Sequence, residues 1–269
     1  MELKEKVKEF WNAHPLGSYE ISAQIESKEY FEGLSRIRES SSKFVMDFYG
    51  FKECEGKMVL DVGCGPGWIT VNYARKGANI FSIDLTLNAV KMAKRWLGLE
   101  GLKGRIAVGD AEELPFADES FDFVCSDGVL HHTPGTEEGM AEIYRLLKKG
   151  GKAVISLYHK NLLLSSPIFP LTKFIMKILG VKTHGVKAMG RVTSEELVRL
   201  YDGIDNPLGK AYTKQVWENK LKEVGFIIEG YRFFYFPIRF IPYSRYLPKQ
   251  ICSILDRVCG TMVFFRVKK

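Results

Sequence analysis

The chain has 269 residues and a formal net charge of +7, with 46% hydrophobic and 26% charged side chains. These proportions are those of a globular protein and exclude a collagen, a coiled coil or a wholly disordered chain. A chain of this length buries enough apolar surface to fold without disulfides or metals.

Residues 1–50 predict a helical cover in two parts, because a proline and a glycine break the chain around residues 14–17. From residue 57 on, short apolar runs alternate with stretches of helical periodicity. The predicted elements are strands at 58–62, 79–83, 106–108, 121–126 and 153–157, the last after a turn at 150–151, and helices at 69–76, 88–97 and 137–149. This alternation predicts an α/β fold, in which a doubly wound parallel sheet carries helices on both faces.

After residue 158 the alternation ends. Residues 159–225 predict a lid, and residues 226–269 predict a last pair of strands. The predicted elements are a short helix from about Leu171, helices at 193–201 and 213–224, strands at 226–236 and 262–267, and a helix near 248–258 inserted between those strands. No internal repeat or clear linker is visible, so we expect one domain over residues 1–269 with its core at 51–158.

Targeting and cysteine signals indicate a cytoplasmic protein. The charged first residues, 1–6, lack the apolar core of a secretion signal, and no apolar run reaches the ~18–20 residues that span a bilayer. The five cysteines are odd in number and show no CxxC spacing, so we expect reduced thiols.

The strongest functional signal is the glycine turn Gly63-Cys64-Gly65-Pro66-Gly67 between the first strand and the first helix of the core. Glycines at this place let the backbone approach a nucleotide-like ligand closely. Asp84 ends the second strand, 21 residues after Gly63, where a carboxylate can accept hydrogen bonds from ribose hydroxyls. A dehydrogenase is the alternative, but its GxGxxG fingerprint is not met, because Trp68 stands where the third glycine belongs.

Five motifs in this order resemble the class I S-adenosylmethionine-dependent methyltransferases of the small-molecule branch. They are Asp61 to Gly67, Asp84, Gly109-Asp110-Ala111, Phe121 to Ser126 with Gly128 to His132, and Glu142 to Gly151. The match covers about residues 57–158. It implies a Rossmann-like sheet, mostly parallel with an antiparallel last strand, with S-adenosylmethionine as cofactor and S-adenosylhomocysteine as product.

The resemblance also implies which residues bind the cofactor. They are Gly63, Cys64 and Gly65 in the turn, Asp84 and Leu85 at the ribose, Asp110 and Ala111 at the adenine, Ser126 at the fourth strand, and Asp61. Asp61 lies too early to reach the ribose, so it either organises the turn or holds the cofactor's ammonium through water. The structural alternative for Asp84 and Asp110 is capping of strand ends.

Candidates for proton transfer follow the fourth and fifth strands. Methyl transfer depends mainly on alignment, and a base is needed only when the nucleophile must lose a proton. His131 and His132, then Tyr158 and His159, fall at the carboxyl edge of the sheet, where ligands bind. We expect His132 to face the substrate, while one member of each pair caps a helix or packs instead.

The charge is unevenly distributed along the chain. Residues 1–150 carry 19 basic and 24 acidic side chains, whereas residues 151–194 carry seven basic and no acidic ones. A predicted helix with Lys173 and Lys177, and an aromatic and basic stretch at 231–246, belong to this second half. This composition suits an apolar or anionic substrate, a membrane surface or nucleic acid, or only a solvated face.

Absences narrow the acceptor. No Asn/Asp-Pro-Pro-aromatic motif or Pro-Cys pair follows the fourth strand, which disfavours methylation of nucleic-acid bases. No His/Cys/Asp cluster has metal-ligand spacing, so we predict no metal. We therefore expect a methyltransferase with a small, apolar or anionic acceptor. The alternatives are an RNA or protein methyltransferase that docks through the basic half, and a non-catalytic S-adenosylmethionine-binding module.

Overall fold

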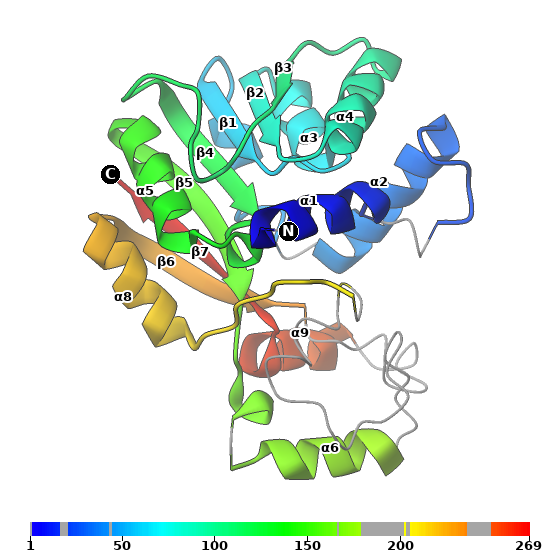
Figure 1. The fold of residues 1–269 in the computed structure, drawn as a ribbon, viewed down its shortest axis with the longest axis vertical. Coiled ribbons are helices and arrows are strands. Elements are labelled where there is room, and N and C mark those ends of the chain that lie inside the picture. Colours follow the sequence, from blue (N-terminus) through cyan, green and yellow to red (C-terminus); the bar gives the residue numbers. More distant parts are fainter. Residues whose placement is uncertain are drawn as a thin grey trace.

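A seven-stranded sheet in the order β3-β2-β1-β4-β5-β7-β6 forms the centre of the molecule (Figure 1). The structure, a computed structural model, describes residues 2–16, 21–42, 45–165, 167–178, 202, 205–235 and 249–269. The strands are β1 (Met58–Val62), β2 (Asn79–Asp84), β3 (Arg105–Val108), β4 (Phe121–Asp127), β5 (Leu147–Tyr158), β6 (Ile227–Phe234) and β7 (Met262–Lys268). The first five strands pair in parallel, and β7 runs antiparallel to both β5 and β6. The predicted fold class is therefore confirmed.

Helices lie on both faces of this sheet, across its carboxyl edge and, in the case of α6, away from it (Figure 1). They are α1 (Leu3–Ala13), α2 (Lys28–Ser42), α3 (Trp68–Arg75), α4 (Leu87–Leu99), α5 (Thr136–Leu146), α6 (Phe169–Ile178), α8 (Lys214–Val224) and α9 (Lys249–Cys259), with single 3₁₀ turns η1 (Phe51–Glu53), η2 (Leu130–His132) and η3 (Leu162–Leu164). None of the helices in the described ranges is long and apolar enough to cross a membrane.

Strand alternation divides the apolar residues between two cores. In β1, Val59 joins the core beneath α2, α3 and α4, while Leu60 and Val62 join the core beneath α5 and α8. Successive side chains of a strand point to opposite faces, so each buried strand supplies both cores. Trp217 of α8 is fully buried and donates its indole N–H to the Tyr158 carbonyl, 2.8 Å away, which ties α8 to the end of β5.

The predicted helix at 137–149 is too long, and the predicted strand at 153–157 is too short. In the structure α5 ends at Leu146 and β5 begins at Leu147, which pairs with Phe121 of β4. The Leu and Lys residues there have helical propensity, but pairing with a neighbouring strand outweighs it. Gly150 and Gly151 lie within β5, where the Gly150 N–H donates to the carbonyl of Lys269, so they are not a turn between elements.

The remaining predicted elements agree with the structure to within a few residues where it describes them. Helix α6 begins at Phe169, two residues earlier than expected, and has Pro170 in its first turn, where proline is tolerated. The predicted helix at 193–201 and residues 236–246 of the aromatic stretch lie outside the described residues.

The direction of winding reverses between β1 and β4. From β1 the chain proceeds outward to β2 and β3, and then returns to place β4 and β5 on the other side. Open α/β sheets bind ligands at the carboxyl edge of such a switch point. Helix α1 crosses this edge over the ends of the central strands (Figure 1).

Candidate functional site

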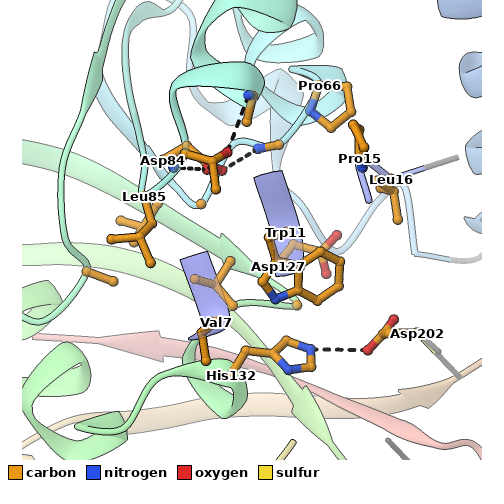
Figure 2. A pocket seen from close by; sticks show the side chains of 18 of the residues that line it. Val7, Trp11, Pro15, Leu16, Pro66, Asp84, Leu85, Asp127, His132 and Asp202 are labelled. Atoms are coloured by element: carbon orange, nitrogen blue, oxygen red, sulfur yellow. Dashed lines mark hydrogen bonds and ion pairs between the residues drawn. The ribbon is translucent and has the colours of Figure 1, made fainter. Parts of the chain in front are cut away.

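A cavity of about 560 Å³ lies at the switch point, within the range of small-molecule sites. Its walls come from the carboxyl ends of β1, β2, β4 and β5, from α1 and α2, and from Asp202, Asp205 and Tyr235 of the second half. Figure 2 shows Val7 and Trp11 of α1 facing Asp84 and His132 across this space. The cavity therefore has one end at β2 and another at β5.

The glycine turn after β1 forms the floor of the first end. Gly63 has φ +74°, and a Cβ there would lie 2.2 Å from a methyl carbon of Val129, so only glycine fits. Gly65 has φ +51°, lines the cavity and has no heavy atom near its Cβ position. The turn thus offers bare backbone to a ligand.

Asp84 ties this turn to the end of β2. Its Oδ2 accepts from the Gly65 N–H at 2.9 Å, and its Oδ1 accepts from the backbone N–H and hydroxyl of Thr86, both at 2.9 Å. Burial raises the pKa of Asp84, and these hydrogen bonds oppose the rise. The carboxylate lines the cavity next to Leu85, so it is held in place and still open to a ligand.

Asp110 and Ala111 line the cavity beyond Leu85, together with Gly109. Asp110 Oδ2 accepts from the ammonium of Lys4 at 2.6 Å, and its Oδ1 accepts from the Glu112 N–H at 3.0 Å. Asp84, the residue predicted to bind ribose, and Asp110, the residue predicted to meet adenine, therefore lie on one wall of the cavity. They follow one another there in the order in which they occur along the chain.

Three predicted cofactor residues do not line the cavity. Asp61 is buried behind the turn, where it accepts from the Thr70 hydroxyl at 2.7 Å, and burial raises its pKa to about 7. Cys64 is buried, and burial raises the pKa of its thiol well above the usual value. Ser126 is also buried, and its hydroxyl has no hydrogen-bond partner in the described part of the chain. These three residues are therefore buried in the interior and do not line the cavity.

The second end of the cavity brings together His131, His132 and Tyr158. His131 packs on the Tyr158 ring with centroids 3.8 Å apart, and burial holds its pKa well below the usual value, so it is neutral. Neither of its ring nitrogens has a well-formed hydrogen bond among the described residues, although the Ser156 backbone lies near. His159 is not part of the cavity; it stacks on Phe233 instead.

His132 lies between two oxygen acceptors. Its Nδ1 is 2.6 Å from the Leu208 carbonyl oxygen, and its Nε2 is 3.2 Å from Asp202 Oδ2 (Figure 2). The Tyr158 hydroxyl donates to the same Asp202 oxygen, and among the described residues no donor reaches Asp202 Oδ1.

Sequence reasoning missed Asp202, which lies 44 positions from Tyr158 in the chain. None of the motifs in the sequence analysis includes this residue.

Arg38 of α2 was also missed, and it lies where the two ends of the cavity meet. Its guanidinium donates to Asp127, which also accepts from the Tyr49 hydroxyl at 2.9 Å. The guanidinium carbon lies 4.8 Å from the centroid of the Trp68 ring. Arg38 Nε is buried and makes no hydrogen bond in the described ranges, while the charge of the guanidinium is paired with Asp127.

The cavity is acidic. Its described lining holds one arginine, Arg38, and no lysine, against five carboxylates: Asp84, Asp110, Asp127, Asp202 and Asp205. The described part of the basic second half supplies two of these carboxylates and no lysine or arginine. The lysines and arginines that the structure describes in that half therefore lie outside the cavity lining. No group of His, Cys, Asp or Glu among the described residues is arranged to hold a metal.

Known proteins are similar to this chain in sequence and in fold. A sequence model of the family described as "Methyltransferase domain" matches residues 60–155. A ubiquinone biosynthesis O-methyltransferase of Dechloromonas aromatica (strain RCB) is 31% identical over 176 residues, which cover 59% of this chain and 72% of the relative. Methyltransferase GfsG of Streptomyces halstedii is 36% identical over 104 residues, which cover 38% of this chain and 37% of the relative.

Solved structures agree at the level of the fold. A SAM-dependent methyltransferase of Methanosarcina mazei superposes with a TM-score of 0.56 at 19% identity, and the match covers 84% of this chain and 96% of that one.

The sequence matches to several curated relatives span about a third to a half of the length of those relatives, with shares of 37%, 32% and 53%.

Proposed function

The chain belongs to the class I S-adenosylmethionine-dependent methyltransferases, and from this premise we propose that it methylates a small molecule. The observation that carries the proposal is the cavity at the switch point, where a bare glycine turn is tied to the Asp84 carboxylate. When bound there, S-adenosylmethionine supplies an electrophilic methyl group on a sulfonium.

The first end of the cavity fits this cofactor. Asp84 would accept from the ribose hydroxyls, and Asp110 with Ala111 would meet the adenine. Gly65 leaves room for the part of the cofactor that links its ribose to its methionine group. Arg38 lines the cavity with its guanidinium paired to Asp127, and it is the one arginine of the described lining that could meet the cofactor's carboxylate.

The second end would hold the acceptor. Its charge favours a neutral acceptor with an O–H or N–H group over an anion, because an anion would face the carboxylates of Asp202 and Asp205. We propose that the proton of this O–H or N–H group passes to Asp202 Oδ1. The other carboxylate oxygen, Oδ2, is already in contact with His132 and Tyr158. As the acceptor bonded to the methyl carbon, the bond from that carbon to sulfur would break to leave S-adenosylhomocysteine, and the acceptor's proton would pass to Asp202.

The buried thiols suit a reducing compartment. Cys54, Cys64, Cys125 and Cys259 are all buried and unpaired among the described residues. We therefore propose that the protein works in the cytoplasm, where thiols stay reduced.

The test measures cofactor binding and turnover separately. Calorimetry should show that S-adenosylmethionine and S-adenosylhomocysteine bind to the wild type. Labelled methyl transfer is then measured on a panel that carries a phenol, an amine or a carboxylate on one apolar body, and the carboxylate should be the poorest acceptor. Absence of cofactor binding would overturn the proposed function.

Asp202→Asn should reduce kcat by about 10²–10⁴-fold, as loss of a general base does, and leave cofactor affinity unchanged. Asp205→Asn is the matched control, because Asp205 lines the same end of the cavity but makes no described contact with His132. Equal turnover by Asp202→Asn and the wild type would remove the assignment of the proton to Asp202.

A further inference from the structure

Helix α1 closes the cavity over the predicted cofactor site. Val7 and Phe10 of α1 line the cavity and are 4% and 8% exposed, and Trp11 lines it one residue further on. The chain after the helix, at Pro15 and Leu16, continues the same wall (Figure 2). A cofactor bound against Asp84 would therefore lie against α1.

Lys4 at the start of α1 holds this end of the helix. Its ammonium lies 2.6 Å from Asp110 Oδ2 and 2.5 Å from Glu112 Oε2. The two carboxylates are fixed from the other side, because Asp110 accepts from the Glu112 N–H and Glu112 accepts from the Gly135 N–H at 2.7 Å. Lys4 is the only cation that pairs with either of them in the described part of the chain.

The other end of α1 reaches the acceptor end of the cavity. The Trp11 ring lies edge-on to the His132 ring with centroids 5.1 Å apart. The Asn12 carbonyl accepts from the Asn88 side chain of α4 at 3.2 Å. One helix therefore connects the adenine candidate Asp110 with His132.

We propose that Lys4 is a positioning residue of the cofactor site: it latches α1 over the bound cofactor and orients the Asp110 carboxylate toward the adenine. This inference rests on the proposed function. Lys4 is itself a third exposed, so the pair is weak enough to open during each exchange of product for cofactor. Loss of the latch speeds the release of product.

The test compares Lys4→Gln with Lys6→Gln. Lys6 is an exposed lysine of the same helix that makes no described ion pair, so both variants lose one charge from α1. S-adenosylhomocysteine is the probe, and its dissociation is followed by stopped-flow tryptophan fluorescence. We expect Lys4→Gln to dissociate about threefold to tenfold faster at low salt, and Lys6→Gln to match the wild type.

A second readout separates latching from a general loss of stability. In hydrogen exchange, S-adenosylhomocysteine should protect residues 3–13 in the wild type and in Lys6→Gln, and protect them less in Lys4→Gln. The KM for S-adenosylmethionine should rise while the KM for the acceptor stays the same, and Lys4→Arg should restore slow dissociation.

Equal dissociation rates for Lys4→Gln and Lys6→Gln would overturn the latch and leave the proposed function standing. If the wild type binds no S-adenosylhomocysteine at all, the proposed function fails and the latch fails with it.

Discussion

Asp84 combines two tasks in one side chain. It accepts a hydrogen bond from Gly65 in the turn and two more from Thr86 at the start of α4. Asp84 therefore ties the glycine turn after β1 to the beginning of α4. The same carboxylate lines the cavity. A residue that both builds and lines a site affects binding directly through lost contacts and indirectly through a displaced turn.

Asp84→Ala should therefore weaken S-adenosylmethionine binding by about tenfold or more, since hydrogen bonds to a charged group are lost and the Gly65 N–H loses its acceptor. Calorimetry measures the effect. Glu55→Ala is the control, because Glu55 is an exposed acid away from the cavity. Unchanged affinity in Asp84→Ala would show that this carboxylate does not contact the cofactor.

At the scale of the element, the glycine turn works by its backbone shape. Gly63 is limited both by its positive φ and by Val129, which packs where a Cβ would be. Gly67 has φ +99° and packs against Ala93 of α4 in the same way. The turn therefore places β1, α3 and α4 together, and its exposed face at Gly65 is left for a ligand.

Gly63→Ala tests this shape against Gly56→Ala. Gly56 has a similar φ, +69°, but nothing lies within 4 Å of its Cβ position, so the two variants share the backbone strain and differ in the overlap. Gly63→Ala should lower the free energy of unfolding by about 1–3 kcal/mol more than Gly56→Ala, and it should abolish cofactor binding. Denaturant unfolding and calorimetry measure both effects, and equal behaviour of the two variants would contradict the packing argument.

At the scale of the whole molecule, a buried acid makes stability depend on pH. Asp61 lies in the interior between β1 and α3, and its pKa of about 7 exceeds the ordinary value of 3.8 in an unfolded chain. The folded state therefore binds more protons than the unfolded state between those values. The stability linked to Asp61 is fully present below about pH 4 and is lost as the pH rises through about 7.

Asp61→Asn should remove this dependence, because the amide keeps an oxygen that can accept from Thr70 and carries no charge. Relative to the wild type, the variant should gain roughly 2–3 kcal/mol of unfolding free energy between pH 5 and pH 8. Urea unfolding at the two pH values measures the gain. Other titrating groups, such as the buried His131, are common to both proteins and cancel in the difference. A difference that does not change with pH would mean that Asp61 is ionised in the folded protein throughout this range.

Local patterns in the sequence determine much of this protein. The alternation of strands and helices, the glycine turn, and the placement of Asp84 and Asp110 after successive strands all follow from short-range periodicity and spacing. A parallel sheet brings the ends of its strands to one edge, so residues predicted at those ends lie together without further information.

Only the tertiary structure decides which residues lie in the cavity and which lie behind it. Arg38 meets Asp127 across 89 positions of the chain, Lys4 meets Asp110 across 106, and Tyr158 meets Asp202 across 44. Spacing in the sequence carries no signal for contacts of that length, because they form when separate segments pack on one edge of the sheet. The same holds for the cavity lining: Asp61 and Val62 are adjacent and both buried, yet only Val62 lines the cavity, because α3 packs against the face of β1 that carries Asp61.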